Sequence, residues 1–147
     1  MPLSPEDKAT LIAKIIANYG LSAVTGINSM VQLAVELSDG ELEERYPSAY
    51  VATLTGSTIN QKKFILVREL YAVYLLFKTN PIAWGVYSQS QGVSSVKNSA
   101  GSSVSFRNAN EIRISDYALQ VQGLLIDLGL IEQKSVIVFN NQSNSLV

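Results

Sequence analysis

The apolar stretch from Ile59 to Lys78 constrains the fold of this chain more than any other part of the sequence. Its aliphatic and aromatic side chains would cover most of the circumference of a helix. Thr58 stands directly before it and is a residue type that caps helix N-termini, while Asn80-Pro81 stops a helix after it. A helix that is apolar almost all round must be covered by others, so the stretch predicts the central helix of a bundle.

The most apolar window of this stretch, Phe64 to Phe77, is interrupted by two charges, Arg68 and Glu69. These charges and its short length make the window unsuited to span a bilayer. Because consecutive residues lie about 100 degrees apart on a helix, the two side chains do not face each other. Each therefore needs its own partner or a route to solvent, and an oligomer interface is one source of such a partner.

Further helices are predicted on both sides of the central one. Ser4-Pro5 begins a helix that ends near Tyr19, and Ser115-Asp116 begins another that ends near Gly129. Ser38 followed by Glu41 has the spacing of a capping box, which predicts a short third helix ending before Pro47. The second helix is indicated by apolar residues at three- and four-residue intervals: Val24, Ile27, Val31, Ala34 and Leu37. The run from Tyr50 to Thr55 suits a strand or a helix equally.

A Ser/Gly/Val segment from Gly85 to Asn108 separates the central helix from the last one. Its only charges are Lys97 and Arg107. Apolar and polar residues alternate in it, and the turn-forming run from Asn98 to Gly101 lies near its middle. These features predict a β-hairpin arm, which would be marginal alone and would be ordered mainly by neighbouring subunits. Its alternating apolar residues are Val86, Val93, Val96, Val104 and Phe106.

The C-terminal segment, residues 132–147, has too few apolar residues to build a core. Ser135 to Phe139 is a strand candidate, and the polar run NNQSNSLV follows it. We expect this tail to bind another protein. The residues that would pair there are Val136, Ile137, Val138 and Phe139.

The chain is expected to form one mainly α domain, 1–147. It has 147 residues, 47% of them hydrophobic, which suffices for one core. The predicted architecture is a small helical bundle, the body 4–84 and 109–131, with an inserted β-hairpin arm, 85–108. An extended, strand-like C-terminal tail, 132–147, completes it.

Composition excludes several classes of function. The chain has no cysteine and no histidine, which removes disulfides, zinc sites of the usual kind and every catalytic triad that uses histidine. The formal net charge is -1 without a cationic block, so specific nucleic-acid binding is not expected. The acidic group Glu41, Glu43 and Glu44 lacks the order of a calcium loop and fits a solvated helix start better than a metal site. We expect no cofactor, and the N-terminus does not indicate export.

Ser94 and Lys97 have the S-x-x-K spacing by which a lysine can activate a serine nucleophile. That motif works at the start of a buried helix with companion motifs, whereas here it lies in a polar arm without them. A small serine hydrolase is therefore an alternative and not the main hypothesis. Trp84, just before the arm, is the aromatic residue most expected at a contact surface.

The order of these elements resembles that of the head-to-tail connector, or adaptor, proteins of long-tailed bacteriophages. The resemblance covers about half the chain, from Ile59 to Ile131. It rests on the helix RELYAVYLLFKT, a polar arm containing SVSF and the helix DYALQVQGLLIDLGL. The family has no catalytic motif, so the resemblance is one of organisation.

The resemblance implies a non-enzymatic virion protein at the neck of the particle, made in the host cytoplasm. Such subunits form a ring, expected to be twelve-membered, between the portal protein and the next neck or tail component. DNA would pass through the ring without specific binding, and no membrane is involved. The residues expected at contacts are Trp84, Val93, Val96, Lys97, Val104, Phe106, Val136, Ile137, Val138 and Phe139. Alternatives are another neck or tail-completion protein, such as a tail terminator or stopper, and a helical host adaptor with no viral role.

Overall fold

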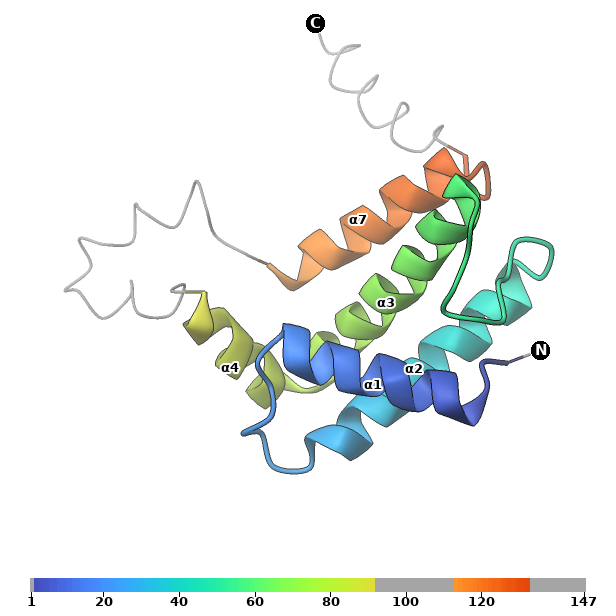
Figure 1. Cartoon of the computed structure of the whole chain (residues 1–147). Coiled ribbons are helices and arrows are strands. Elements are labelled where there is room, and N and C mark those ends of the chain that lie inside the picture. The colour runs from blue at the N-terminus through green and yellow to red at the C-terminus, as the bar shows by residue number, and fades with distance from the viewer. Residues whose placement is uncertain (1, 92–112, 133–147) are drawn as a thin grey trace, which may run out of the picture.

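The fold is known from a computed structural model that describes residues 2–91 and 113–132. Within these ranges the chain forms five α-helices and no strand (Figure 1). The prediction of a mainly α protein is therefore confirmed. The helices are α1 (Pro5–Asn18), α2 (Ile27–Arg45), α3 (Ile59–Thr79), α4 (Pro81–Ser90) and α7 (Ile114–Asp127).

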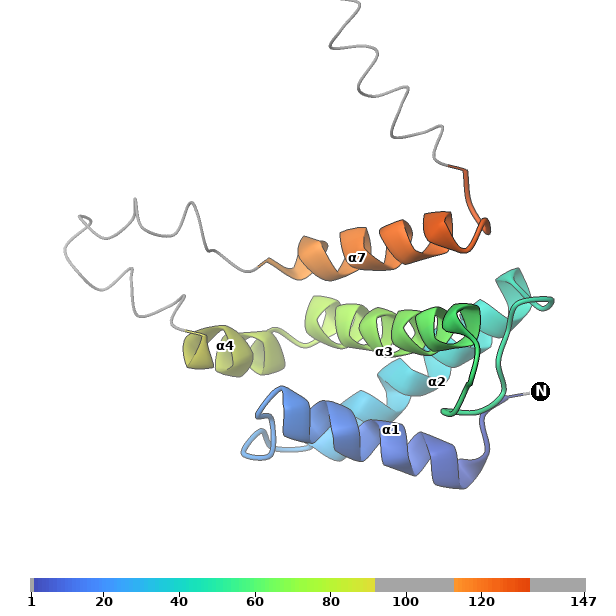
Figure 2. The same ribbon diagram turned by 45° about the horizontal axis from the view of Figure 1, so that its top comes forward.

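Helix α3 is the centre of the molecule, as its apolar sequence predicts. It contacts each of the other four helices. Figure 2 shows the layers: α7 lies along one side of α3, and α1 and α2 lie on the opposite side. The last predicted helix therefore packs against the central one as expected.

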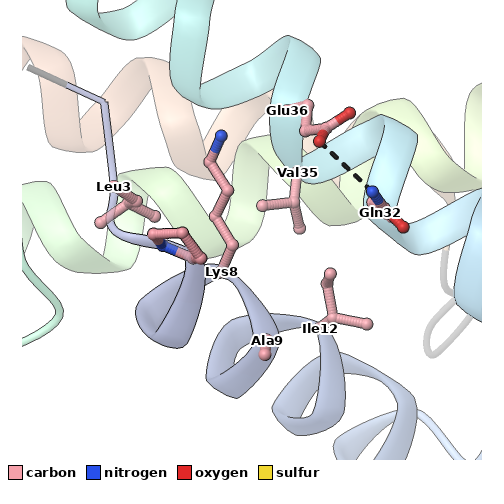
Figure 3. A pocket seen from close by; sticks show the side chains of 8 residues that line it. Leu3, Lys8, Ala9, Ile12, Gln32, Val35 and Glu36 are labelled. Atoms are coloured by element: carbon pink, nitrogen blue, oxygen red, sulfur yellow. Dashed lines mark hydrogen bonds between the residues drawn. The ribbon is translucent and has the colours of Figure 1, made fainter.

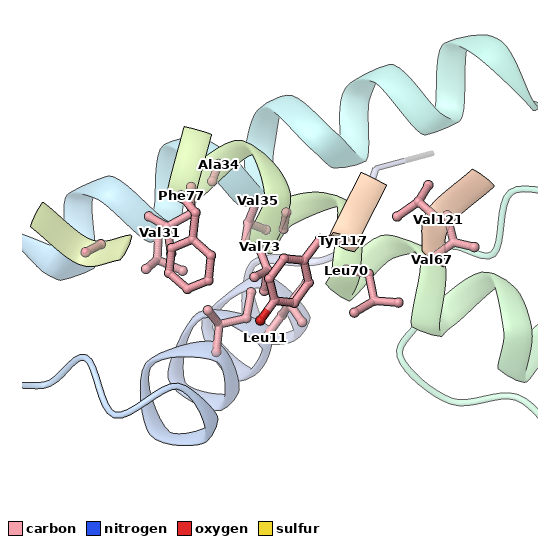
Figure 4. Close-up of a cluster of buried hydrophobic side chains, with 14 of the residues drawn as sticks. Leu11, Val31, Ala34, Val35, Val67, Leu70, Val73, Phe77, Tyr117 and Val121 are labelled. Carbon is pink, nitrogen blue, oxygen red and sulfur yellow. The ribbon is translucent and has the colours of Figure 1, made fainter. Parts of the chain in front are cut away.

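The core fills the space on both sides of α3 (Figure 4). Phe77 and Val73 of α3 are fully buried, and they meet Leu11 of α1 and Val31 of α2 in the same cluster. On the other side of α3, Tyr117 and two aliphatic residues of α7 close the core. Burying a large apolar side chain fully stabilises the fold by about 1.5–3 kcal/mol, so these contacts hold the layers together.

Several helix ends follow the predicted chemistry. The Ser4 hydroxyl accepts a hydrogen bond from the Asp7 amide at the start of α1. At the start of α3, Thr58 and Gln61 form a reciprocal capping box that satisfies free amides. Asn80 ends α3.

The predicted short third helix is wrong. Ser38 to Glu41 lie inside α2, which continues to Arg45. Buried residues continue at helical spacing through this region, so one face of a single helix meets the core. The Ser38 hydroxyl donates to the Val35 carbonyl instead of capping a new helix. Residues 46–58 form a loop without helix or strand, which settles the open assignment of Tyr50 to Thr55.

The predicted start of the hairpin arm is also wrong. Gly85 to Ser90 belong to α4, so Val86, assigned to the first strand, is helical. Pro81 ends α3 as predicted, but it is also preset for the first position of a helix and begins α4. The remainder of the arm falls in 92–112, and the C-terminal tail falls in 133–147. Both lie outside the described residues.

None of the described helices combines the length and hydropathy needed to cross a membrane.

Two glycines test the continuity of α2. Gly40 has open space where a Cβ would stand, and its φ is not positive. Gly40→Ala should therefore raise the free energy of unfolding by up to about 1 kcal/mol, because alanine has the higher helix propensity. Gly26 caps α2 with φ 74°, so Gly26→Ala should lower the free energy of unfolding by about 1–2 kcal/mol. Urea unfolding of both variants measures this. A loss of stability in Gly40→Ala would mean that α2 breaks there.

Candidate functional site

The structure describes one of the ten predicted contact residues. Trp84 lies in α4 and is half-buried, with its ring 5.2 Å from that of Phe77. It packs mainly against its own chain. The other nine lie outside the described residues; they are Val93, Val96, Lys97, Val104, Phe106, Val136, Ile137, Val138 and Phe139. Ser94, of the alternative hydrolase hypothesis, lies outside them as well.

An aromatic cluster joins α4 and α7 to the body. The Phe77 ring of α3 stacks on Tyr87 of α4 at 5.4 Å and meets the edge of Tyr117 of α7 at 5.8 Å. Tyr19, at the end of α1, contacts the same rings, at 5.0 Å from Tyr87. Aromatic pairs at these separations contribute about 0.5–1.5 kcal/mol each beyond their burial. The cluster explains why α4 forms where the sequence predicted a strand.

Burial keeps the tyrosines of this cluster neutral. It raises the pKa of Tyr19 to about 12, with smaller contributions from the negative charge of Glu69 and from Tyr87. Burial also raises the pKa of Tyr117, and its hydrogen bond with Tyr87 acts in the same direction. These hydroxyl groups therefore remain protonated near neutral pH.

A buried ion pair fixes α2 against α3. Arg68 Nε lies 3.0 Å from Asp39 Oδ1, and both side chains are almost completely inaccessible, at 0% and 1% exposure. The Tyr50 hydroxyl donates to the same carboxylate at 2.7 Å, and the Leu3 amide donates to Oδ2 at 3.1 Å. Since an unpaired buried charge is strongly unfavourable, these donors are what allow Asp39 to stay in the interior.

The other guanidinium nitrogens of Arg68 hold the loop 46–58. Nη1 donates to the Thr53 carbonyl at 2.9 Å, and Nη2 donates to the Val51 carbonyl. The guanidinium also lies over the Tyr50 ring, 4.9 Å from its centroid. Burial and the hydrogen bond to Asp39 raise the pKa of Tyr50. This cluster of Asp39, Arg68 and Tyr50 is an internal clamp that joins the N-terminus, α2, the loop and α3.

The neighbouring charges also find partners inside the chain. Glu69 pairs with Lys14 of α1 at 2.9 Å, so neither Arg68 nor Glu69 depends on an oligomer interface for a partner. Glu41 pairs with Arg45 at 2.7 Å and accepts a hydrogen bond from the Tyr71 hydroxyl at 2.6 Å. The acidic group is thus not a helix start. Among the described residues no cluster of potential metal ligands is found.

A shallow hollow of about 350 Å³ lies between α1 and α2 (Figure 3). Lys8 and Glu36 flank it, and Ile12 and Val35 form part of its apolar floor. Glu36 is occupied by a hydrogen bond from Gln32, and both residues are exposed. The hollow offers no converging set of buried polar groups, which a specific small-molecule site needs.

A groove of about 420 Å³ between α2 and α3 differs from this hollow because every residue lining it is uncharged. Leu33 and Leu37 of α2 stand on one side, exposed by 58% and 55%, and Leu75 of α3 stands on the other. Leu37 lies in the second helix, as its spacing predicted, but it is exposed and does not join the core. The signal for the groove was a second stripe on α2, since Met30, Leu33 and Leu37 are spaced by three and four residues.

The outward face of α4 is also uncharged. Ile82, at 68% exposure, is the most exposed large hydrophobic residue in the described ranges. Gly85, the partly buried Val86 and the exposed Gln89 follow it at helical spacing. No residue of α4 carries a charge. The groove and this face are the described surfaces best suited to bind another protein.

Comparison with known proteins yields no relative: the chain matches no protein-family model, no curated protein and no solved structure.

The clamp predicts that single substitutions lower stability strongly and that their effects are not additive. Asp39→Asn should lower the free energy of unfolding by about 3–5 kcal/mol, because it leaves the Arg68 charge buried without its counter-ion. Asp39→Leu combined with Arg68→Met should be less destabilising than the sum of the two singles. Glu69→Gln, at the more exposed pair, is the matched control and should change stability by less than about 1 kcal/mol. Urea unfolding of these five variants, the two singles of the pair included, measures the effects. A loss below about 1 kcal/mol in Asp39→Asn would contradict the clamp.

The aromatic cluster predicts a loss of stability in alkali. The pKa of Tyr19 is about 10 in an unfolded chain and about 12 in the fold, so folding favours its protonated form. Its contribution is complete below pH about 10 and is lost as the pH rises toward 12. Unfolding should therefore coincide with the ultraviolet absorbance of tyrosinate, and Tyr19→Phe should reduce the pH dependence. A fold that titrates all its tyrosines near pH 10 without unfolding would exclude this.

Proposed function

We propose that this chain is a structural virion protein, the head-to-tail connector of a long-tailed bacteriophage. Its subunits form a ring at the neck of the particle, expected to be twelve-membered. The ring binds the portal protein on one side and the next neck or tail component on the other, and it extends the channel through which DNA passes.

The observation that carries this proposal is the pair of uncharged apolar surfaces on the described body. Isolated exposed hydrophobic residues are normal, but Leu33 and Leu37 border a groove, and Ile82 lies on a helix that has no charge at all. Surfaces of this kind favour protein contacts. They support the proposal that the chain is a structural subunit that binds other proteins.

The internal pairing of charges supports the same proposal. Arg68, Glu69 and Glu41 all have partners within the chain. The body is therefore held together without help from a neighbour, and its outward surfaces are kept in fixed positions. A connector acts through such geometry.

The charge balance suits a channel for DNA. Every phosphate contact adds salt-dependent affinity, and a protein that gripped DNA would hinder its passage. With a formal net charge of -1 and no cationic block, the chain fits a ring through which DNA slides.

Reconstitution with the portal tests the proposal. The purified chain, mixed with the portal protein encoded in the same genome, should form rings that stack on the portal in electron micrographs. Binding to a tail-tube end in place of the portal would reassign the chain as a tail terminator. A chain that stays monomeric at high concentration and binds neither would overturn the proposal.

A further inference from the structure

Helix α4 presents a face that its own chain does not cover. Its inner face carries Trp84 and Tyr87, which pack on Phe77. The opposite face carries the exposed Ile82, and Val86, one helical turn further on, is partly buried against the core at the edge of that face. Figure 1 shows α4 projecting from the end of α3 beyond the rest of the bundle. This position makes the outward face accessible to another molecule.

The groove between α2 and α3 has the matching chemistry. Leu33 and Leu37 form one wall, Leu75 contributes to the other, and no charged residue lines it. A helix that enters such a groove must itself bring apolar residues and no charge, since an unpaired charge would lose its hydration there. Among the described helices, α4 alone lacks charged residues.

Gly85 supports a close approach of the α4 backbone to another molecule. It lies inside α4, where glycine lowers helix propensity, and nothing within 4 Å occupies the space of a Cβ. Its φ is not positive, so the fold of the single chain does not require glycine there. A flat position between Ile82 and Val86 would let the backbone of α4 approach the leucines of a groove closely.

We infer that the outward face of α4 docks into the α2/α3 groove of a second copy of this chain. The inference rests on the proposed assembly and names the two surfaces that meet. Because the contact joins different surfaces, one subunit of a pair keeps its groove free and the other keeps its α4 free, so the contact propagates around a ring. Residues such as Ile82 fill the pocket, as apolar helix anchors do in groove recognition.

Disulfide trapping tests the contact directly, because the natural chain has no cysteine. Leu33→Cys and Ile82→Cys are prepared as separate proteins, and both sites are exposed, so folding should be preserved. Under mild oxidation the mixture should give a cross-linked dimer, and each protein alone should not. Leu119→Cys, equally exposed on α7, is the control and should not cross-link to Ile82→Cys.

Ile82→Glu and Leu33→Glu extend the test to affinity. Each should weaken self-association measured by analytical ultracentrifugation about tenfold or more, because a charge would enter an apolar contact. Leu119→Glu should have no effect. Cross-linking of Leu33→Cys or Ile82→Cys with itself would show a symmetric contact and overturn the inference. Rings that survive both glutamate substitutions would overturn it while leaving the connector proposal intact. Absence of any self-association would overturn both.

Discussion

The buried ion pair between Arg68 and Asp39 is the interaction on which the rest of the fold depends. Through it the central helix binds α2, and the remaining donors of Arg68 bind the carbonyls of a loop that has no secondary structure of its own. Two charges in the interior are tolerated because every oxygen of the carboxylate has a donor, including the Tyr50 hydroxyl and the Leu3 amide. The pair thus fixes how one wall of the α2/α3 groove stands relative to the other.

Because the ion pair fixes the groove, the exposed leucines along it hold constant positions relative to one another. A leucine on a mobile surface would repack or be shielded, whereas Leu33 and Leu37 stand on a helix anchored by Asp39 a short distance along the same chain. The aromatic cluster around Phe77 does the same for α4 at the other end of the central helix. Structure and proposed assembly are therefore linked: internal contacts satisfy the charges, and the uncharged faces remain for neighbours.

Local signals predicted α1, α3 and α7 but divided α2 and missed α4, and they gave no information on long-range contacts. Thr58 and Ser4 cap their helices as expected, because capping depends on residues only three positions away. The partner of Arg68 lies 29 residues earlier in the chain, and no periodicity reveals it. Ser38 and Glu41 match a capping box, but the buried clamp keeps α2 continuous there. For the candidate surfaces, the stripe on α2 was readable, while α4 was hidden in a segment whose composition suggested a strand.

The described residues form a helical body with an uncharged groove and a projecting uncharged helix, and we propose that subunits assemble through these two surfaces. Electron cryomicroscopy of the purified oligomer tests that claim most directly. The account predicts a closed ring in which Ile82 of each subunit lies against Leu33 and Leu37 of the next. A ring in which α4 faces solvent, or a chain that forms no oligomer at all, would contradict it.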